Sequence, residues 1–202
     1  MILPGGRRDF HMFTIPNLLT TLRILLVAPT IWLLNEELYF AALAVGTIAL
    51  ITDFFDGMLA RKLNQQSYVG AILDPVADKI AVIAFFGFFY VNGQTPLWYF
   101  LLIFIRDVAQ LLAIPVLLWW KKIQFKVEPA LIAKWGTALN FIILGAIWIK
   151  IVVLKYLPEW AFYGDYILWP LYIVSGIIEV YVLVTYVPRF FQILRGKHDT
   201  FN

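Results

Sequence analysis

Residues 38–91 read LYFAALAVGTIALITDFFDGMLARKLNQQSYVGAILDPVADKIAVIAFFGFFYV, and the pattern of this stretch predicts the class of fold. It contains two apolar segments, 38–60 and 69–91, with the polar turn NQQS at 64–67 between them. Each segment is long enough to cross a bilayer as a helix, which takes about 20 mostly apolar residues. Because the turn is short, the two helices are expected to be antiparallel neighbours.

The same pattern continues on both sides of this hairpin. The chain has 202 residues, of which 62% are hydrophobic and 14% charged, whereas a soluble domain is about half apolar and a quarter charged. Backbone groups in hydrocarbon must be hydrogen-bonded within the chain, and the apolar runs do not alternate as barrel strands do. We therefore predict an all-α integral membrane protein, with residues 1–202 forming a single domain. The six predicted transmembrane helices are 16–35, 38–60, 69–91, 97–119, 131–154 and 166–187.

The composition also excludes several kinds of chemistry. The chain has no cysteine, which removes disulfides, thiol catalysis and cysteine metal sites. Its two histidines, His11 and His198, lie near opposite ends, so neither a histidine metal cluster nor a Ser-His-Asp triad is expected. The net charge of +3 is too modest to indicate a nucleic-acid partner.

Basic residues fix the expected orientation, since Lys and Arg gather on the cytoplasmic side of a membrane. The predicted helices leave Lys150 and Lys155 on one side and ten basic residues on the other. Both termini, the 64–67 turn and the loop before residue 131 are therefore predicted to be cytoplasmic, in an inner membrane. The ten residues on that side are Arg7, Arg8, Arg61, Lys62, Lys121, Lys122, Lys126, Arg189, Arg195 and Lys197.

The predicted membrane topology also assigns roles to the chain ends and to the aromatic residues near the helix ends. Residues 1–15 are expected to be an interfacial segment, either a short surface helix or a frayed end, and residues 188–202 a cytoplasmic tail. Six aromatic residues near the predicted interfaces are expected to be membrane anchors: Trp98, Tyr99, Trp119, Trp120, Trp160 and Tyr163.

Four aspartates stand within the predicted membrane hairpin. Asp53 and Asp56 are three residues apart, and Asp74 and Asp78 four apart, so each pair lies on one helix face. Four carboxylates that converge in a small, partly dry space cannot all ionise, so some take up protons or a cation binds. With oxygen ligands only, the cation would be Mg²⁺, Mn²⁺ or Ca²⁺, and this many carboxylates favour two ions over one.

The spacing of residues 53–78 is D-x2-D-G-x2-A-R-x8-G-x3-D-x3-D, and the chain thereby resembles the CDP-alcohol phosphotransferase family at all eight defining positions. Six spans with both ends cytoplasmic are similar to the family architecture. The resemblance implies an enzyme that uses CDP-diacylglycerol: an acceptor hydroxyl attacks the lipid-side phosphorus, and CMP leaves. It also implies a homodimer and two divalent cations, Mg²⁺ or Mn²⁺.

The resemblance also implies the roles of the eight residues. Asp53, Asp56 and Asp74 would bind the metal ions, while Asp78 would be the general base and also touch a metal ion. The remaining four positions would shape the CDP pocket; these are Gly57, Ala60, Arg61 and Gly70.

Residues outside the signature bear on the acceptor. The opening Ile15–Arg23 resembles phosphatidylglycerophosphate synthases and cardiolipin synthases of the CDP-alcohol type, which implies a glycerol-type acceptor: glycerol 3-phosphate or phosphatidylglycerol. Arg23, Arg106 and Lys134 are then expected to contact the acceptor or a phosphate. An inositol phosphate remains an alternative acceptor, and Asn140 departs from the glutamine usual in the family's Lys-x-x-Thr-x-x-Gln pattern.

Each of these cations also has a structural interpretation. Arg23 could snorkel to the interface instead, and Arg106 could form an internal ion pair with Asp107 that orients its helix. Glu179 could pair with a cation in the bundle or find a hydroxyl.

Other functions compete with the transferase. A carboxylate-lined cation carrier is the main non-enzymatic rival, although its charges should be spread through the membrane rather than gathered near one side. A membrane prenyltransferase would show different aspartate spacing, and a scaffold would not need converging carboxylates.

Overall fold

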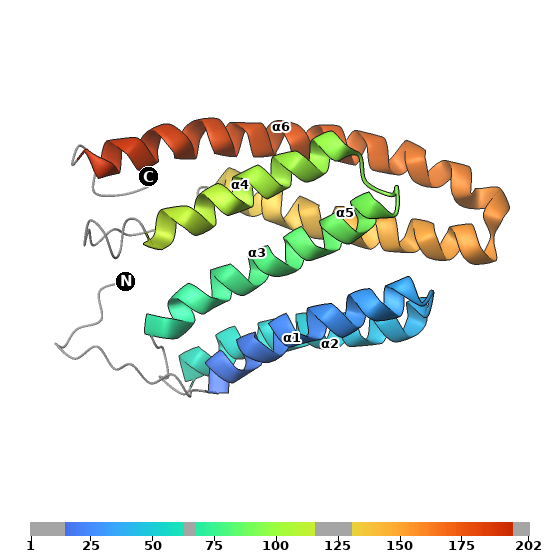
Figure 1. Cartoon of the computed structure of the whole chain (residues 1–202), viewed down its shortest axis with the longest axis horizontal. Helices are drawn as coiled ribbons and strands as arrows, with labels where there is room; N and C mark the ends of the chain where they lie inside the picture. Colours follow the sequence, from blue (N-terminus) through green and yellow to red (C-terminus); the bar gives the residue numbers. More distant parts are fainter. Residues whose placement is uncertain (1–14, 63–67, 116–130, 196–202) are drawn as a thin grey trace. The chain divides into compact units, whose positions relative to one another are not determined.

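The computed structural model describes residues 15–62, 68–115 and 131–195, and these ranges consist almost entirely of helix (Figure 1). No strand occurs within these ranges, so the predicted all-α class is confirmed. The helices follow the predicted apolar segments closely. They are α1 (Ile15–Asn35), α2 (Tyr39–Lys62), α3 (Tyr68–Val91), α4 (Leu97–Pro115), α5 (Leu131–Tyr156) and α6 (Ala161–Leu194), with a short 3-10 turn, η2 (Pro158–Trp160), before α6.

Local backbone geometry ends α1 and α3 at the gaps between the predicted helices, 36–37 and 92–96. Gly93 has φ of 70°, and Gly93 N donates to Tyr90 O at 3.0 Å, a left-handed C-terminal cap that glycine adopts without strain. Glu37 fills the equivalent position after α1 with φ of 57°. This conformation costs a residue with a side chain about 1 kcal/mol, and the bond from Leu38 N to Leu33 O at 2.9 Å helps to offset that cost.

The chain forms two compact units, residues 1–85 and 86–202. In the first unit α1 packs along α2 (Figure 1). The buried side of α1 recurs every three or four residues, as on one face of a helix, and consists of Asn17, Thr20, Arg23, Val27, Thr30 and Leu34. Since α2 returns antiparallel to α1, the N-terminal half of α1 lies at the same end of this unit as the C-terminal half of α2.

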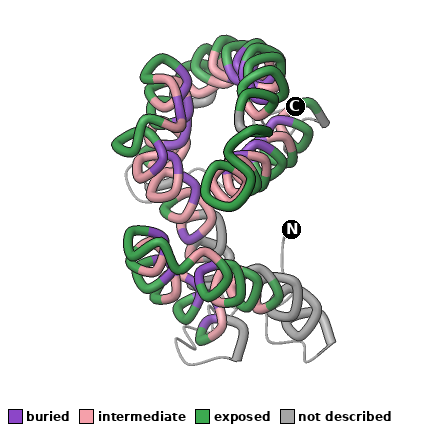
Figure 2. The backbone as a smooth tube through the Cα atoms, turned by 90° about the vertical axis from the view of Figure 1, so that its right-hand side faces the viewer, coloured by how far each residue is buried: buried purple, intermediate pink, exposed green. Residues whose placement is uncertain are grey.

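In the second unit, α6 packs against both α4 and α5. Glycines allow these contacts: a Cβ atom added to Gly176 would lie 3.0 Å from Trp98 Cζ3, and one added to Gly136 would lie 3.0 Å from Ile178 Cγ2. Figure 2 shows the buried positions as stripes along the helices, with exposed positions on the other sides.

Three of the described helices have the length and composition to cross a membrane: Asn17–Asn35, Ile132–Tyr156 and Pro158–Gln192. The first half of α2, Tyr39–Ala49, is a shorter apolar stretch. Large apolar side chains are also exposed, as expected for a surface in contact with lipid; Trp32 is 59% exposed and Ile177 66% exposed. The chain is thus indicated to be an integral membrane protein, and the full count of six crossings stays a prediction.

Not all the aromatic anchors lie where they were predicted. Trp98, Trp160 and Tyr163 are exposed, but Tyr99 is fully buried, so its assignment as an anchor is wrong. Trp119 and Trp120 lie outside the described residues, as does most of the 1–15 segment. The predicted tail, 188–202, begins inside α6, which continues to Leu194.

The packing of α4 against α6 predicts that Gly176→Val destabilises the protein, because the valine would displace the indole of Trp98. Overpacking of this kind costs about 1–3 kcal/mol, or roughly 2–4 °C of melting temperature per kcal/mol in a chain of this size. The matched control is Gly145→Val, since a Cβ atom at Gly145 meets nothing within 4 Å. Thermal unfolding in detergent would measure both variants, and equal melting temperatures would contradict the prediction.

Candidate functional site

The eight signature positions lie on two consecutive helices. Five of them fall in the C-terminal half of α2, from Asp53 to Arg61, and three in the first half of α3, from Gly70 to Asp78. On an α-helix, Asp53 and Asp56 are about 60° apart in projection and Asp74 and Asp78 about 40° apart, so each helix carries its carboxylates on one face. This backbone arrangement is the one that was predicted.

Asp78 is the signature residue whose side chain the structure describes. The structure does not describe the side chains of the other seven, which are Asp53, Asp56, Gly57, Ala60, Arg61, Gly70 and Asp74. Their metal and CDP roles therefore remain predictions.

Asp78 forms an ion pair with Arg23, in which Nη1 of the arginine donates to Oδ1 of the carboxylate. The pair joins α1 to α3 across 55 residues of sequence. The Arg23 side chain is 6% exposed, whereas that of Asp78 is 49% exposed. This burial contradicts the snorkelling alternative, because a snorkelling guanidinium would be exposed, whereas that of Arg23 is enclosed by protein and paired with Asp78.

Arg23 belongs to a polar stretch on the buried face of α1. Asn17 and Thr20 precede it at intervals of three residues and are 4% and 0% exposed. Sequence reasoning did not select these two residues as site candidates. The sequence feature that could have identified them is their spacing: Asn17, Thr20 and Arg23 are three residues apart and therefore share one helix face.

A second buried group of charges lies in the second unit, around Arg106 on α4. Its guanidinium binds Glu179 of α6 through two nitrogens, with Nε 2.7 Å from Oε2. Its Nη1 also donates to Asp107 Oδ1 at 2.6 Å. All three side chains are buried. The predicted internal pair with Asp107 and the predicted pairing of Glu179 with a bundle cation are both confirmed.

Asn140 of α5 extends this group. Its Nδ2 donates to Glu179 Oε1 at 2.8 Å, and its Oδ1 lies 2.8 Å from the Tyr99 hydroxyl and 3.0 Å from Ser175 Oγ. Gly136 lies one turn earlier on α5, where an added Cβ atom would be 3.5 Å from Glu179 Oε1, an ordinary contact distance. Asparagine in place of the expected glutamine therefore has a structural function, which is to connect α4, α5 and α6.

The residues predicted to contact the acceptor differ in their surroundings. The Arg106 guanidinium is engaged by two carboxylates, and Lys134 is exposed on α5. Arg23 is occupied by Asp78. The contacts of these three cations with a phosphate stay predictions.

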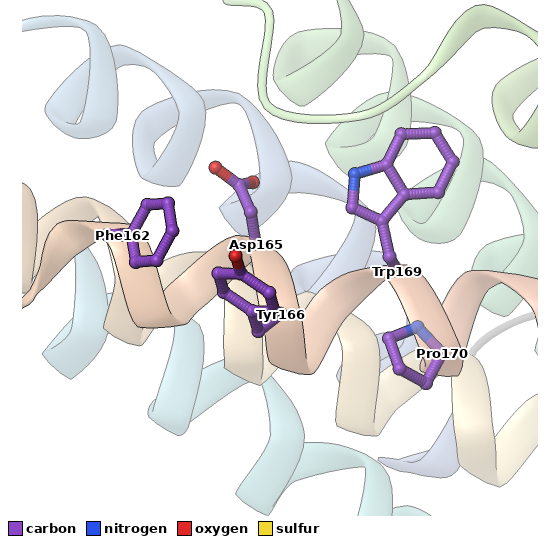
Figure 3. Close-up of a pocket in the computed structure, with 5 residues that line it drawn as sticks. All are labelled: Phe162, Asp165, Tyr166, Trp169 and Pro170. Atoms are coloured by element: carbon purple, nitrogen blue, oxygen red, sulfur yellow. The ribbon is translucent and has the colours of Figure 1, made fainter.

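A shallow pocket of about 470 Å³ lies at the start of α6 (Figure 3). Its lining consists of Phe162, Asp165, Tyr166, Trp169 and Pro170, none of them a signature residue. Asp165 already accepts a hydrogen bond from Lys150 Nζ at 2.7 Å. The pocket thus offers aromatic surface and one paired carboxylate, which is not a set of groups suited to transfer chemistry.

The signature offers only oxygen ligands to the expected cations. Among the side chains that the structure describes, no three potential ligands gather into a metal cluster. The signature aspartates outside that set offer carboxylate oxygens alone, which suit hard ions such as Mg²⁺ and Mn²⁺. Asp78, whose side chain is 49% exposed, lies on the same helix as Asp74.

The chain is similar to a known protein family and to several named proteins. A family model described as CDP-alcohol phosphatidyltransferase matches residues 13–185. A protein of Aquifex aeolicus named CDP-diacylglycerol--glycerol-3-phosphate 3-phosphatidyltransferase is 37% identical over 128 residues, which are 61% of this chain and 68% of that protein. A protein of the same name from Escherichia coli K12 is 44% identical over 78 residues, 35% of this chain and 40% of that protein.

A Mycobacterium tuberculosis protein, whose name assigns it provisionally to the cardiolipin synthases, is 30% identical over 108 residues, 53% of this chain and 52% of that protein. Apart from the Aquifex protein, these matches thus span about half or less of each relative's length.

The buried charges around Arg106 predict a large cost for Glu179→Leu, because the change leaves a guanidinium in the protein interior without its bidentate partner. Removal of one member of a buried pair costs about 3–5 kcal/mol. Asp165→Asn is the control: it breaks the Lys150–Asp165 pair, whose carboxylate side chain is 58% exposed, and such a pair contributes at most about 1 kcal/mol. Denaturant unfolding would measure both, and equal losses would contradict the prediction.

Proposed function

Because this chain belongs to the CDP-alcohol phosphatidyltransferase family, we propose that it transfers the phosphatidyl group of CDP-diacylglycerol to the hydroxyl of a glycerol-type acceptor, with release of CMP. The observation that carries this proposal is the complete signature on α2 and α3, with all eight positions at the family spacing. The product would be an anionic phospholipid.

The proposed reaction is a displacement at phosphorus. The acceptor hydroxyl oxygen attacks the lipid-side phosphorus of the diphosphate, and the bond from that phosphorus to the bridging oxygen breaks, so that CMP departs with the electron pair. Asp78 takes the hydroxyl proton. Its half-exposed carboxylate is accessible to an acceptor, while Arg23 fixes it from the protein side.

Asp53, Asp56 and Asp74 would hold two divalent cations, with Asp78 beside them. Bound there, the cations would supply charge neutralisation for the diphosphate and for the leaving CMP. Gly57, Ala60 and Gly70 would leave room for the nucleotide, and Arg61 would bind a phosphate with its fork of N–H donors.

We further propose how the protein sits in the membrane. All six helices would cross the inner membrane with both chain ends in the cytoplasm, since ten basic residues fall on that side of the predicted topology. The signature would face the cytoplasm, where CMP is released. A homodimer and a single domain over residues 1–202 complete this proposal, by analogy with the family.

Two acceptors are favoured by different relatives. Glycerol 3-phosphate is named for the Aquifex and Escherichia proteins, and would give phosphatidylglycerophosphate. Phosphatidylglycerol, which would give cardiolipin, is the second candidate because of the mycobacterial protein. Both have a free hydroxyl on glycerol and a phosphate that cationic side chains could bind.

The proposal predicts that the purified, reconstituted protein releases CMP from CDP-diacylglycerol only when an acceptor is present. Glycerol 3-phosphate, phosphatidylglycerol and an inositol phosphate would be offered in parallel, with lipid products identified by mass. We expect product from one of the two glycerol-type acceptors. Absence of product from all three, together with metal flux in liposomes free of CDP-lipid, would favour the cation carrier instead.

The proposed role of the cations predicts that EDTA abolishes this turnover, because four neighbouring carboxylates would otherwise repel the diphosphate. Added Mg²⁺ or Mn²⁺ should restore it. The melting temperature in EDTA, measured on the same sample, separates loss of chemistry from loss of fold. Undiminished CMP release in EDTA would refute metal dependence.

A further inference from the structure

The Arg23–Asp78 ion pair joins two elements that the sequence keeps far apart. Arg23 lies at the third position of the buried polar stretch on α1, and Asp78 is the last signature residue, on α3. The two belong to the same compact unit. The contact therefore brings α1, which carries no signature residue, into direct contact with the signature.

The two members of the pair differ in exposure, so the enclosed arginine is the fixed member and the aspartate is the one that it orients. The Arg23 side chain is enclosed, with 6% of its surface exposed, whereas 49% of the Asp78 side chain is open. A planar guanidinium enclosed in this way has few conformations left, and its N–H groups point in fixed directions. The Asp78 carboxylate is thus held through Oδ1 by a rigid donor, while part of it remains accessible from outside.

Orientation of this kind matters for a proton acceptor. A general base must lie within hydrogen-bond reach of the proton that it removes, and misplacement by about 1 Å can cost about 10²-fold in rate. An aspartate side chain that is half open would otherwise rotate between several conformations. The buried guanidinium selects one of them.

We propose that Arg23 is a positioning residue that acts through Asp78, rather than a residue that contacts the acceptor or the diphosphate. This inference rests on the proposed function, in which Asp78 is the general base. The sequence predicted that Arg23 contacts the acceptor or a phosphate directly. Here Arg23 acts on the reaction only through the position of Asp78. Arg23→Gln should therefore affect the chemical step and leave substrate binding nearly unchanged.

A double-mutant cycle tests this inference in the full-length, reconstituted protein. Arg23→Gln, Asp78→Asn and the double variant are compared with the unmodified chain in kcat and in KM for each substrate. We expect Arg23→Gln alone to lower kcat by about 10–10²-fold with both KM values within about twofold. In the Asp78→Asn background the same change should alter kcat by less than about threefold, because residues that act as one unit are not additive.

Two further variants keep the test decisive. Arg23→Lys retains the charge without the planar fork and should recover part of the lost kcat; it also replaces Arg23→Gln if that variant does not fold. Asp78→Glu supplies an active background where Asp78→Asn leaves no measurable turnover. Lys150→Gln is the control, since it removes a cation from the Lys150–Asp165 pair outside the signature and should leave kcat unchanged.

The outcomes separate this inference from the function on which it rests. Equal loss of kcat from Arg23→Gln in both backgrounds, or a tenfold rise in KM for CDP-diacylglycerol, would show direct contact with substrate and would overturn the inference alone. Full turnover in Asp78→Asn would refute the assignment of the base, and the inference would fall with it.

Discussion

A charged side chain inside an apolar helical protein must meet an opposite charge, and the described parts of this chain satisfy that requirement by joining helices that are distant in sequence. Arg106 is bound by Glu179, 73 residues away, and Arg23 by Asp78, 55 residues away. Removal of such a group from water costs several kcal/mol unless a partner compensates. In each unit the charges therefore fix which helix faces lie opposite one another, while the surrounding apolar side chains only require burial.

The helices themselves were predictable from sequence because the length of an apolar run determines the length of a membrane-crossing helix. The gaps between the predicted helices, at 36–37 and 92–96, marked helix ends correctly, and the left-handed residues Glu37 and Gly93 show how the helices end there. Tyr99 was misassigned for a physical reason: its position near a helix end does not reveal which way its side chain points. It faces the bundle, where Asn140 and Ser175 satisfy its hydroxyl.

The candidate site was predictable to a different extent. The two apolar segments placed the eight signature positions on two helices, and the spacing of three or four residues placed each aspartate pair on one helix face. The partner of Asp78 could not be predicted, since it depends on how α1 is rotated against its neighbours. The same rotation buries Asn17 and Thr20. The partners of Arg106, in contrast, could be predicted from the sequence. Asp107 is its neighbour and Glu179 is an isolated carboxylate in a predicted transmembrane helix, and both bind Arg106.

These features indicate an integral membrane protein that carries the family signature on α2 and α3, with an ion pair from Arg23 of α1 to Asp78. The direct test of its central property is binding of Mn²⁺ to the purified protein, followed by electron paramagnetic resonance in the presence of CDP-diacylglycerol. We expect two bound ions per chain, as in a two-metal site, and loss of binding in Asp56→Asn. Unchanged Mn²⁺ binding in that variant would contradict the assignment of the signature carboxylates as the metal ligands.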